Sequence, residues 1–411
     1  MSMRATSSSQ LNRATTGLKP HVPRGARRTI LHLCRDLESA DPGRETVDLA
    51  VLTQRSGGRA LIASSGGMLV TEAERAAVRH TRMPLDGRGL FSSWRNKVHL
   101  AALVQRERPA IIHAHGLDLL PLAMGLSRTH RVPFIVDLTE PLPKNQRTSG
   151  LIEALAAMPC LVRVPSEFML FDMLEKFPFP SKRIWHIPPG IDLQWYSANS
   201  ISAERLQGLS RLWRLPEQAT VTMVPMPLQR GYGHEVFLEA LASLKDENIF
   251  SVLIGDDKQS PGRRAELERE VARMELNGRV VMPDFCADWP TAFWLAGIVV
   301  APNVTPNGQN RSLLAAQAIG RPVIVTDSGA NSEMIRSGET AWIVPPNDTK
   351  ALAAALREAT HLSTGQRLGL AERTRHFIAE NFRREQWFEG TMELYENLSH
   401  TPLQDRRSEA A

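Results

Sequence analysis

The segment 301–334, together with the apolar run just before it, constrains the fold of this chain more than any other. Ile298–Ala301 is apolar and partly β-branched, as expected of a buried strand, and a loop rich in Pro, Asn and Gly follows it. An Ala/Leu-rich helical stretch then ends at Gly320, ahead of a second apolar run at Val323–Thr326. Strand, helix and strand in this order predict a parallel α/β unit. The loop before the helix is where such folds bind phosphate, because free backbone amides and the helix dipole point at the anion.

Short apolar runs alternate with helical stretches along most of the chain, which predicts an α/β protein with two Rossmann-like domains. A length of 411 residues is enough for two domains with full cores. The predicted limits are a disordered basic tail at 1–28, a first domain at 29–195, a linker at 196–215, a second domain at 216–376, a crossover helix at 377–398 and a loose tail at 399–411.

Four short segments carry a resemblance to a known family: Ser166-Glu167-Phe168, Pro188–Asp192, Ala316–Ile324 and Val344-Pro345-Pro346. They resemble the framework of retaining GT-B glycosyltransferases of family four, the lipopolysaccharide-core and capsule type. The resemblance covers roughly 29–398. It implies two Rossmann-like domains that face each other across a cleft, with a nucleotide-sugar donor on the second domain and an acceptor on the first.

The charged residues that this family uses at its donor site are replaced here. Its two glutamates, eight positions apart, fall on Asn307 and Ala315, and its Arg and Lys fall on Pro227 and Tyr232. The histidine beside the donor sugar falls on Thr139, so that Thr139 and Asn307 stand at the family's catalytic positions. Hydrogen bonds to charged groups are worth roughly 1.5–3 kcal/mol each, so losing three of them removes on the order of 5 kcal/mol. That corresponds to about 10³–10⁴ in rate.

Several polar or small residues remain near the expected donor and acceptor positions. By resemblance, the donor-binding candidates are Arg230, Pro283, Asn307, Gly308, Asn310, Arg311 and Ser312, and the acceptor-side candidates are Asp41, Gly43 and His115. We expect Arg230 and Arg311 to face the same anion at the N-terminus of the helix that starts near Arg311. Either Asn310 or Ser312 is expected to cap that helix.

The sequence leaves two functions open, both of them in cell-envelope polysaccharide or lipopolysaccharide assembly. One is a protein whose transferase activity is weak or lost, a pseudoenzyme that acts as partner or regulator of another glycosyltransferase. The other is an active retaining hexosyltransferase with a rearranged diphosphate site, which would use a nucleotide sugar and a lipid-linked or oligosaccharide acceptor. A third class, an unrelated two-domain α/β protein such as an epimerase of the same fold, shares the strand and helix pattern.

Charge and cysteine usage bear on partners and compartment. The net charge is +5, and the basic stretch 79–108 indicates either a solvated helix face or contact with anionic lipid. No nucleic-acid-binding motif is present in the sequence. Three scattered cysteines and the lack of a long apolar run predict a cytoplasmic protein, with peripheral contact at the inner face of the membrane. The acid-free stretch 1–28 also has the composition of an organellar transit peptide.

No cofactor and no metal are predicted from the sequence, apart from a nucleotide sugar as donor. His113 and His115 alternate on a predicted strand and therefore face the same side. No third ligand lies near them in the sequence, so the pair alone does not predict a metal site.

Overall fold

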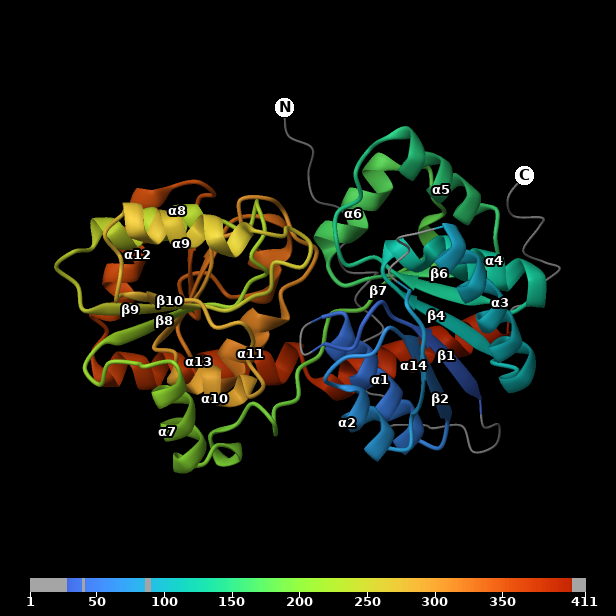
Figure 1. Cartoon of the computed structure of the whole chain (residues 1–411), viewed down its shortest axis with the longest axis horizontal. Helices are drawn as coiled ribbons and strands as arrows, with labels where there is room; N and C mark the ends of the chain where they lie inside the picture. Colours follow the sequence, from blue (N-terminus) through green and yellow to red (C-terminus); the bar gives the residue numbers. More distant parts are fainter. Residues whose placement is uncertain (1–27, 39–40, 86–89, 401–411) are drawn as a thin grey trace.

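The structure, a computed structural model, describes residues 28–38, 41–85 and 90–400, and it contains two parallel β-sheets flanked by helices (Figure 1). The predicted α/β fold of two Rossmann-like domains is confirmed. Apart from Arg28, the predicted basic tail 1–28 lies outside the described residues, as do 401–411 of the predicted C-terminal tail. Within the described part of the chain, no helix combines the length and apolarity needed to cross a membrane.

The first sheet has seven strands, and its inner strands are buried on both faces. In spatial order they are β3 (Arg79–Arg82), β2 (Arg59–Ser64), β1 (Thr29–Leu33), β4 (Ile111–His115), β5 (Phe134–Asp137), β6 (Cys160–Val164) and β7 (Ile184–His186). The helices of this half are α1 (Gly43–Arg55), α2 (Val70–Arg75), α3 (Leu90–Glu107), α4 (Leu120–His130), α5 (Gln146–Ala156) and α6 (Glu167–Lys176). Continuous apolar runs such as Phe134–Val136 form its centre, as is typical of parallel sheets covered on both sides.

The second sheet has six strands, again all parallel. In spatial order they are β10 (Val280–Val281), β9 (Ile249–Leu253), β8 (Thr220–Val224), β11 (Ile298–Ala301), β12 (Val323–Thr326) and β13 (Ala341–Val344). The helices of this half are α7 (Ala203–Leu212), α8 (His234–Ser243), α9 (Arg263–Arg273), α10 (Trp289–Leu295), α11 (Arg311–Ile319), α12 (Thr349–Thr360) and α13 (Thr364–Asn381). In both sheets the strand order reverses beside the first strand of the domain, which is where ligands bind in open α/β sheets.

Helix ends follow the local chemistry of the chain. Ser166 caps α6, because its Oγ accepts a hydrogen bond from the Met169 backbone N–H at 3.2 Å. α11 ends at Gly320, whose φ of 83° lies in the left-handed region that glycine adopts without strain. The N-terminus of α11 differs from the prediction: it begins at Arg311 with no side-chain cap from Asn310.

The last helix, α14 (Arg384–His400), returns to the first domain (Figure 1). Trp387, Leu394, Tyr395 and Leu398 pack with residues of β1, β4 and β5, including Ile30. The crossover helix begins later than predicted. Residues 377–381 still belong to α13, and that helix ends with Phe382 as its C-cap. There the Phe382 carbonyl accepts the Ile191 N–H at 2.8 Å, so the two crossings between domains pair with each other.

The segment predicted as a linker, 196–215, packs on the second domain. Trp213 is buried in that core, and Arg205 pairs with Asp288 at the start of α10 at 2.5 Å.

Candidate functional site

A pocket of about 250 Å³ lies between the two domains, and we call it the cleft pocket. It is lined from the first domain by Glu38, Asp41, Arg44, Asp48 and Met68, from the connection by Ile191, Asp192, Trp195 and Tyr196, and from the second domain by Pro225–Pro227, Ile254–Asp256, Lys258, Asp284–Cys286, Trp289, Phe293, Arg311, Ser312 and Ala315. The second-domain part follows the carboxyl ends of β8 and β9 and includes the N-terminus of α11. This is the place that the sequence predicted for a donor.

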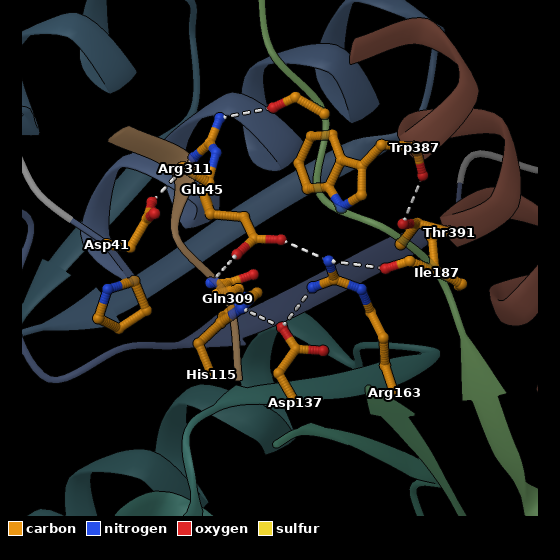
Figure 2. Close-up of polar contacts among 12 residues, drawn as sticks. Asp41, Glu45, His115, Asp137, Arg163, Ile187, Gln309, Arg311, Trp387 and Thr391 are labelled. Carbon is orange, nitrogen blue, oxygen red and sulfur yellow. Dashed lines mark hydrogen bonds and ion pairs between the residues drawn. The ribbon is translucent and has the colours of Figure 1, made fainter. Parts of the chain in front are cut away.

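Arg311 closes the pocket by binding to the first domain. Its Nη1 lies 2.9 Å from Asp41 Oδ1 and its Nη2 lies 3.2 Å from Asp48 Oδ2, while Nη2 also donates to the Gly190 carbonyl at 2.9 Å. Figure 2 shows the guanidinium of Arg311 between Asp41 and a backbone carbonyl. The side chain is 8% exposed, so both ends of the guanidinium are held in a largely dry environment. Carboxylates of the first domain thus already pair with Arg311, the cation at the N-terminus of α11.

The other cations of the cleft pocket are also paired. Arg44 lies 2.5 Å from both Asp48 and Glu72, and Lys258 lies 3.1 Å from Glu38. Burial by itself would raise the pKa of Asp48, but Arg44 and Arg311 outweigh burial and lower that pKa. Its carboxylate therefore stays ionised and keeps both guanidinium groups occupied.

Acidic groups outnumber basic ones around the pocket. The lining residues include six carboxylates (Glu38, Asp41, Asp48, Asp192, Asp256 and Asp284) and three cations (Arg44, Lys258 and Arg311). Among the described lining residues, no cation lacks a carboxylate partner. Electrostatics in this pocket therefore oppose a diphosphate.

The predicted partnership of Arg230 with Arg311 is not what the structure has. Arg230 is 74% exposed, pairs with Glu266 at 2.9 Å, and does not line the cleft pocket. Its pair belongs to the outer surface of α9, whereas Arg311 faces the first domain.

The remaining donor-side candidates divide between the pocket and the packed interior. Ser312 lines the pocket, and its hydroxyl lies 3.4 Å from the Pro225 carbonyl. Asn310 is buried, and its backbone N–H and side-chain amide face the sulfur atoms of Met334 and Met226. Pro283 contributes a carbonyl to Arg264 at 3.4 Å.

Two of the four positions at which the donor site of the resembling family carries charged side chains line the pocket, and both hold uncharged residues here. Pro227 and Ala315 are both among the lining residues. Tyr232 and Asn307 are not, and burial raises the pKa of Tyr232 to about 12, so its phenol is neutral.

The loop that carries Asn307 and Gly308 is packed against the first domain. The Ser166 hydroxyl donates to the Gly308 carbonyl at 2.8 Å, and a Cβ added at Gly308 would overlap the carbonyl oxygen of Thr139. The Asn307 amide turns back to the Gln309 carbonyl at 3.2 Å. The loop that carries Asn307 thus lies against the Thr139 backbone through the neighbouring Gly308.

Glu333 adds a second contact between the domains. Its carboxylate accepts the backbone N–H groups of Glu167 and Phe168 at 2.7 Å each, at the N-terminus of α6. A carboxylate at this end of a helix is stabilised by the free amides and the dipole. A side chain of the second domain therefore occupies the free amides at the start of α6.

The acceptor-side candidates lie in buried or ion-paired positions. Gly43 begins α1, and a Cβ there would come within 2.9 Å of the Glu38 carbonyl oxygen. Asp41 is paired with Arg311 as described, and His115 is buried with its Nδ1 2.8 Å from Asp137 Oδ2.

A buried charge network links the two domains behind the pocket (Figure 2). Arg163 Nη2 lies 2.6 Å from Glu45 and its Nη1 lies 3.2 Å from Asp137, while Gln309 of the second domain donates to Glu45 at 3.4 Å. Burial would raise the pKa of Asp137, but His113 and Arg163 together bring it well below its ordinary value. Sequence analysis missed this network. One signal was available, since Arg163 interrupts an otherwise apolar strand.

His32 is a further residue that sequence analysis missed. It lies on β1, in register with His113 of β4, and its Nδ1 is 3.1 Å from His115 Nε2. Burial lowers the pKa of His113 to about 4 and that of His32 well below its ordinary value, so both rings are neutral at pH 7.

Comparisons with known proteins agree with this architecture. Residues 23–195 match the family model described as Glycosyltransferase Family 4, and 221–361 match the model described as Glycosyl transferases group 1. The lipopolysaccharide core biosynthesis mannosyltransferase LpsB of Rhizobium meliloti is 31% identical over 122 residues, which are 28% of this chain and 34% of that protein. The chain spans about half or less of the length of the curated relatives it matches.

Solved structures match over nearly the whole chain. A glycosyltransferase from Rickettsia africae superposes with a TM-score of 0.79 at 20% identity, covering 92% of this chain and 100% of that one. Anabaena HepE, solved in complex with UDP and glucose, superposes with a TM-score of 0.77 at 19% identity, covering 90% and 99%. The chain therefore has the GT-B fold of the glycosyltransferase group 1 and family 4 proteins.

Proposed function

We propose that this protein is a glycosyltransferase-family component of cell-envelope polysaccharide or lipopolysaccharide assembly whose own nucleotide-sugar site is weak, and that it serves as partner or regulator of another transferase. The proposal rests on one observation: Arg311, the cation at the N-terminus of α11, is held by Asp41 and Asp48 of the same chain. A transferase must neutralise a departing diphosphate, and preorganised charge is usually the largest contribution to its catalysis. Here that charge is already neutralised.

The class of pathway comes from the relatives. LpsB is named for lipopolysaccharide core synthesis, and the Rickettsia glycosyltransferase shares the fold over 92% of this chain. A lipid-linked or oligosaccharide acceptor and peripheral contact with anionic membrane at the cytoplasmic face belong to the same proposal. Part of the basic stretch is paired within the chain, because Arg79 and Arg106 both bind Glu107, at 2.8 and 2.7 Å. This leaves less free charge for a lipid surface.

An active retaining transferase is the second candidate, and the open volume of the pocket favours it. The space of about 250 Å³ is open beside Ser312, and Lys258 is 61% exposed on its side chain. A nucleotide sugar would have to displace Asp41 from Arg311 and draw Lys258 away from Glu38. Both are rearrangements of side chains and need no change of fold.

Titration calorimetry with a panel of UDP-, ADP- and GDP-sugars tests the proposal directly. We expect weak binding by the natural chain, and about tenfold tighter binding by Asp41→Asn, because this change removes one of the two carboxylates on Arg311 (tenfold is ~1.4 kcal/mol). Asp246→Asn is the matched control, since that carboxylate pairs with Arg357 on the outer surface of the second domain. Sugar transfer by the natural chain at ordinary enzymatic rates, unaffected by Asp41→Asn, would contradict a weakened site and establish the second candidate.

A further inference from the structure

Three buried histidines of the first sheet bring ring nitrogens together in a place that the proposed function does not use. His32 lies on β1, and His113 and His115 lie on β4, with His32 and His113 directly opposite each other in the parallel register. All three side chains are at most 2% exposed. One nitrogen from each ring can be chosen so that all lie within 4.8 Å of one another.

The outer nitrogens of two of these rings are held by neighbouring groups. His115 Nδ1 lies 2.8 Å from Asp137 Oδ2, and His113 Nδ1 lies 2.7 Å from the Tyr395 hydroxyl. Metal-binding histidines usually donate their second N–H to a carboxylate or another oxygen, which fixes the ring and leaves the other nitrogen with its lone pair. Asp137 and Tyr395 stand in that position for His115 and His113.

One pair of the inner nitrogens has a spacing close to that of metal ligands. His32 Nδ1 and His115 Nε2 are 3.1 Å apart. Two nitrogens bound to a tetrahedral zinc ion at 2.0–2.1 Å are separated by about 3.3 Å. His113 Nε2 lies 2.9 Å from Asp137 Oδ1, and it becomes the third ligand by exchanging this contact for the ion.

A network of hydrogen bonds without a metal is the alternative arrangement of these side chains. In it, His32 donates to His115, and His113 and His115 donate to Asp137, which leaves His32 Nε2 fully buried without a hydrogen-bond partner. When His32 Nδ1 binds a metal, Nε2 carries the proton, and it has no hydrogen-bond partner among the described residues in either arrangement, so it does not distinguish them. For a metal to replace these hydrogen bonds, the neutral rings of His32 and His113 need only change tautomer, so that His32 Nδ1 and His113 Nε2 present lone pairs.

The surrounding charge also favours a cation. Asp137 and Glu45 both face the single guanidinium of Arg163, at 3.2 and 2.6 Å. Two carboxylates against one guanidinium leave one negative charge in excess in a dry part of the protein, and this excess attracts a cation.

We propose that His32, His113 and His115 bind one divalent transition-metal ion, with Zn²⁺ the expected occupant and Asp137 and Tyr395 as groups that position the ligands. The site lies behind the cleft pocket within the first domain, and its role is to fix β1 against β4. The proposal is independent of any transferase activity.

The test uses the purified full chain, stripped with a chelator and then incubated with Zn²⁺ or Co²⁺. Elemental analysis after desalting should find one metal per chain, and Co²⁺ should show the intense visible absorption of a tetrahedral site. His32→Ala should abolish the retained metal, His32→Cys should restore it because a thiolate also binds Zn²⁺, and His234→Gln, at a buried histidine of the second domain, should leave it unchanged.

A readout on the natural chain covers the case in which these variants fail to fold. X-ray absorption at the zinc edge should show scattering from three imidazole rings, and Zn²⁺ should raise the Tm. Absence of stoichiometric metal in the natural chain would overturn the proposal. So would zinc that gives no multiple-imidazole scattering, or metal retained undiminished by a folded His32→Ala protein.

Discussion

At the scale of single residues, Arg311 decides what the cleft pocket can do. A guanidinium stays protonated at any physiological pH, so its charge must be compensated by the chain or by a ligand. In this protein Asp41, Asp48 and the Gly190 carbonyl compensate it, all three from outside the second domain. Arg311 therefore bridges the two domains, and its guanidinium is not free to bind a ligand.

Replacing Arg311 should be costly for stability. Arg311→Met leaves Asp41 and Asp48 near each other without their shared cation, and breaking a buried pair in this way typically costs about 3–5 kcal/mol. Urea unfolding measures the loss. Arg230→Met is the matched control, because its pair with Glu266 is exposed and screened by solvent, so its loss should change stability little. Equal effects of the two substitutions would show that Arg311 is not a bridge.

His234 predicts a pH dependence of stability. Burial is the main cause that lowers its pKa from 6.5 to about 4, so the folded chain binds fewer protons than the unfolded chain between these values. The contribution of His234 to the free energy of unfolding should be fully present above about pH 6.5. It should be lost on acidification toward pH 4, which lowers the stability by on the order of 3 kcal/mol. Urea midpoints from pH 4.5 to 7.5 should show a slope reduced by about one proton in His234→Gln. An unchanged slope in that variant would assign the acid loss to other groups.

At the scale of elements, the loop 307–309 and the start of α6 form a close contact between the domains. The loop backbone lies against the Thr139 carbonyl and the Ser166 hydroxyl, and Glu333 occupies the free amides of α6 nearby. The absence of a side chain at Gly308 is what allows this approach.

Gly308→Ala should therefore push the domains apart. Its Cβ would overlap the Thr139 carbonyl and come within 2.7 Å of Met169, so either the loop or the domain orientation must shift. We expect a lower Tm and a larger radius of gyration by small-angle scattering. Gly150→Ala is the control, since nothing lies within 4 Å of a Cβ there and alanine favours its helix α5. A Gly308→Ala protein with the dimensions and Tm of the natural chain would refute the close contact.

Element by element, the sequence predicts buried strands well and polar ones poorly. The apolar runs of β11 and β12 and the stop at Gly320 are where the pattern puts them. The edge strand β3, Arg79–Arg82, has no apolar alternation and no buried residue, so hydrophobic periodicity does not identify it as a strand. The crossover helix is displaced because the pairing of Ile191 with Arg383 is a contact between distant segments.

At the scale of the whole molecule, the chain passes between the domains twice and its last helix completes the first core. Trp387, Leu394 and Tyr395 are each at most 3% exposed, among residues of β1, β4 and β5. The first domain is therefore incomplete until the C-terminus has been made.

Leu394→Ala tests this dependence. It removes a fully buried side chain from the contact and should cost about 2–5 kcal/mol, seen as a lower urea midpoint for the first domain. Leu368→Ala on α13, where the leucine is 67% exposed, should stay within about 0.5 kcal/mol. If Leu394→Ala were as mild as the control, α14 would not be part of the first core.

The sequence predicted which charged residues the candidate site lacks, but it did not predict which side chains pair with each other there. Neutral residues at Pro227 and Ala315 are visible in the sequence, and the structure places both on the pocket wall. The pairing of Arg311 with Asp41 joins residues 270 positions apart, and no local pattern specifies it. The same holds for His32, which only the order of the strands brings beside His113.

The pairing of Asp41 with Arg311 also has a consequence for binding measurements. Asp41 acts as a competitor tethered to its own binding site, so its effective concentration is fixed by the fold and does not fall when the protein is diluted. Any external anion therefore binds with its intrinsic affinity reduced by the fraction of time that Arg311 is free. Substitutions at Asp41 should change this apparent affinity for all anions by the same factor, whatever sugar or base they carry. Asp41, together with Asp48, thus sets the concentration at which an external anion can bind Arg311.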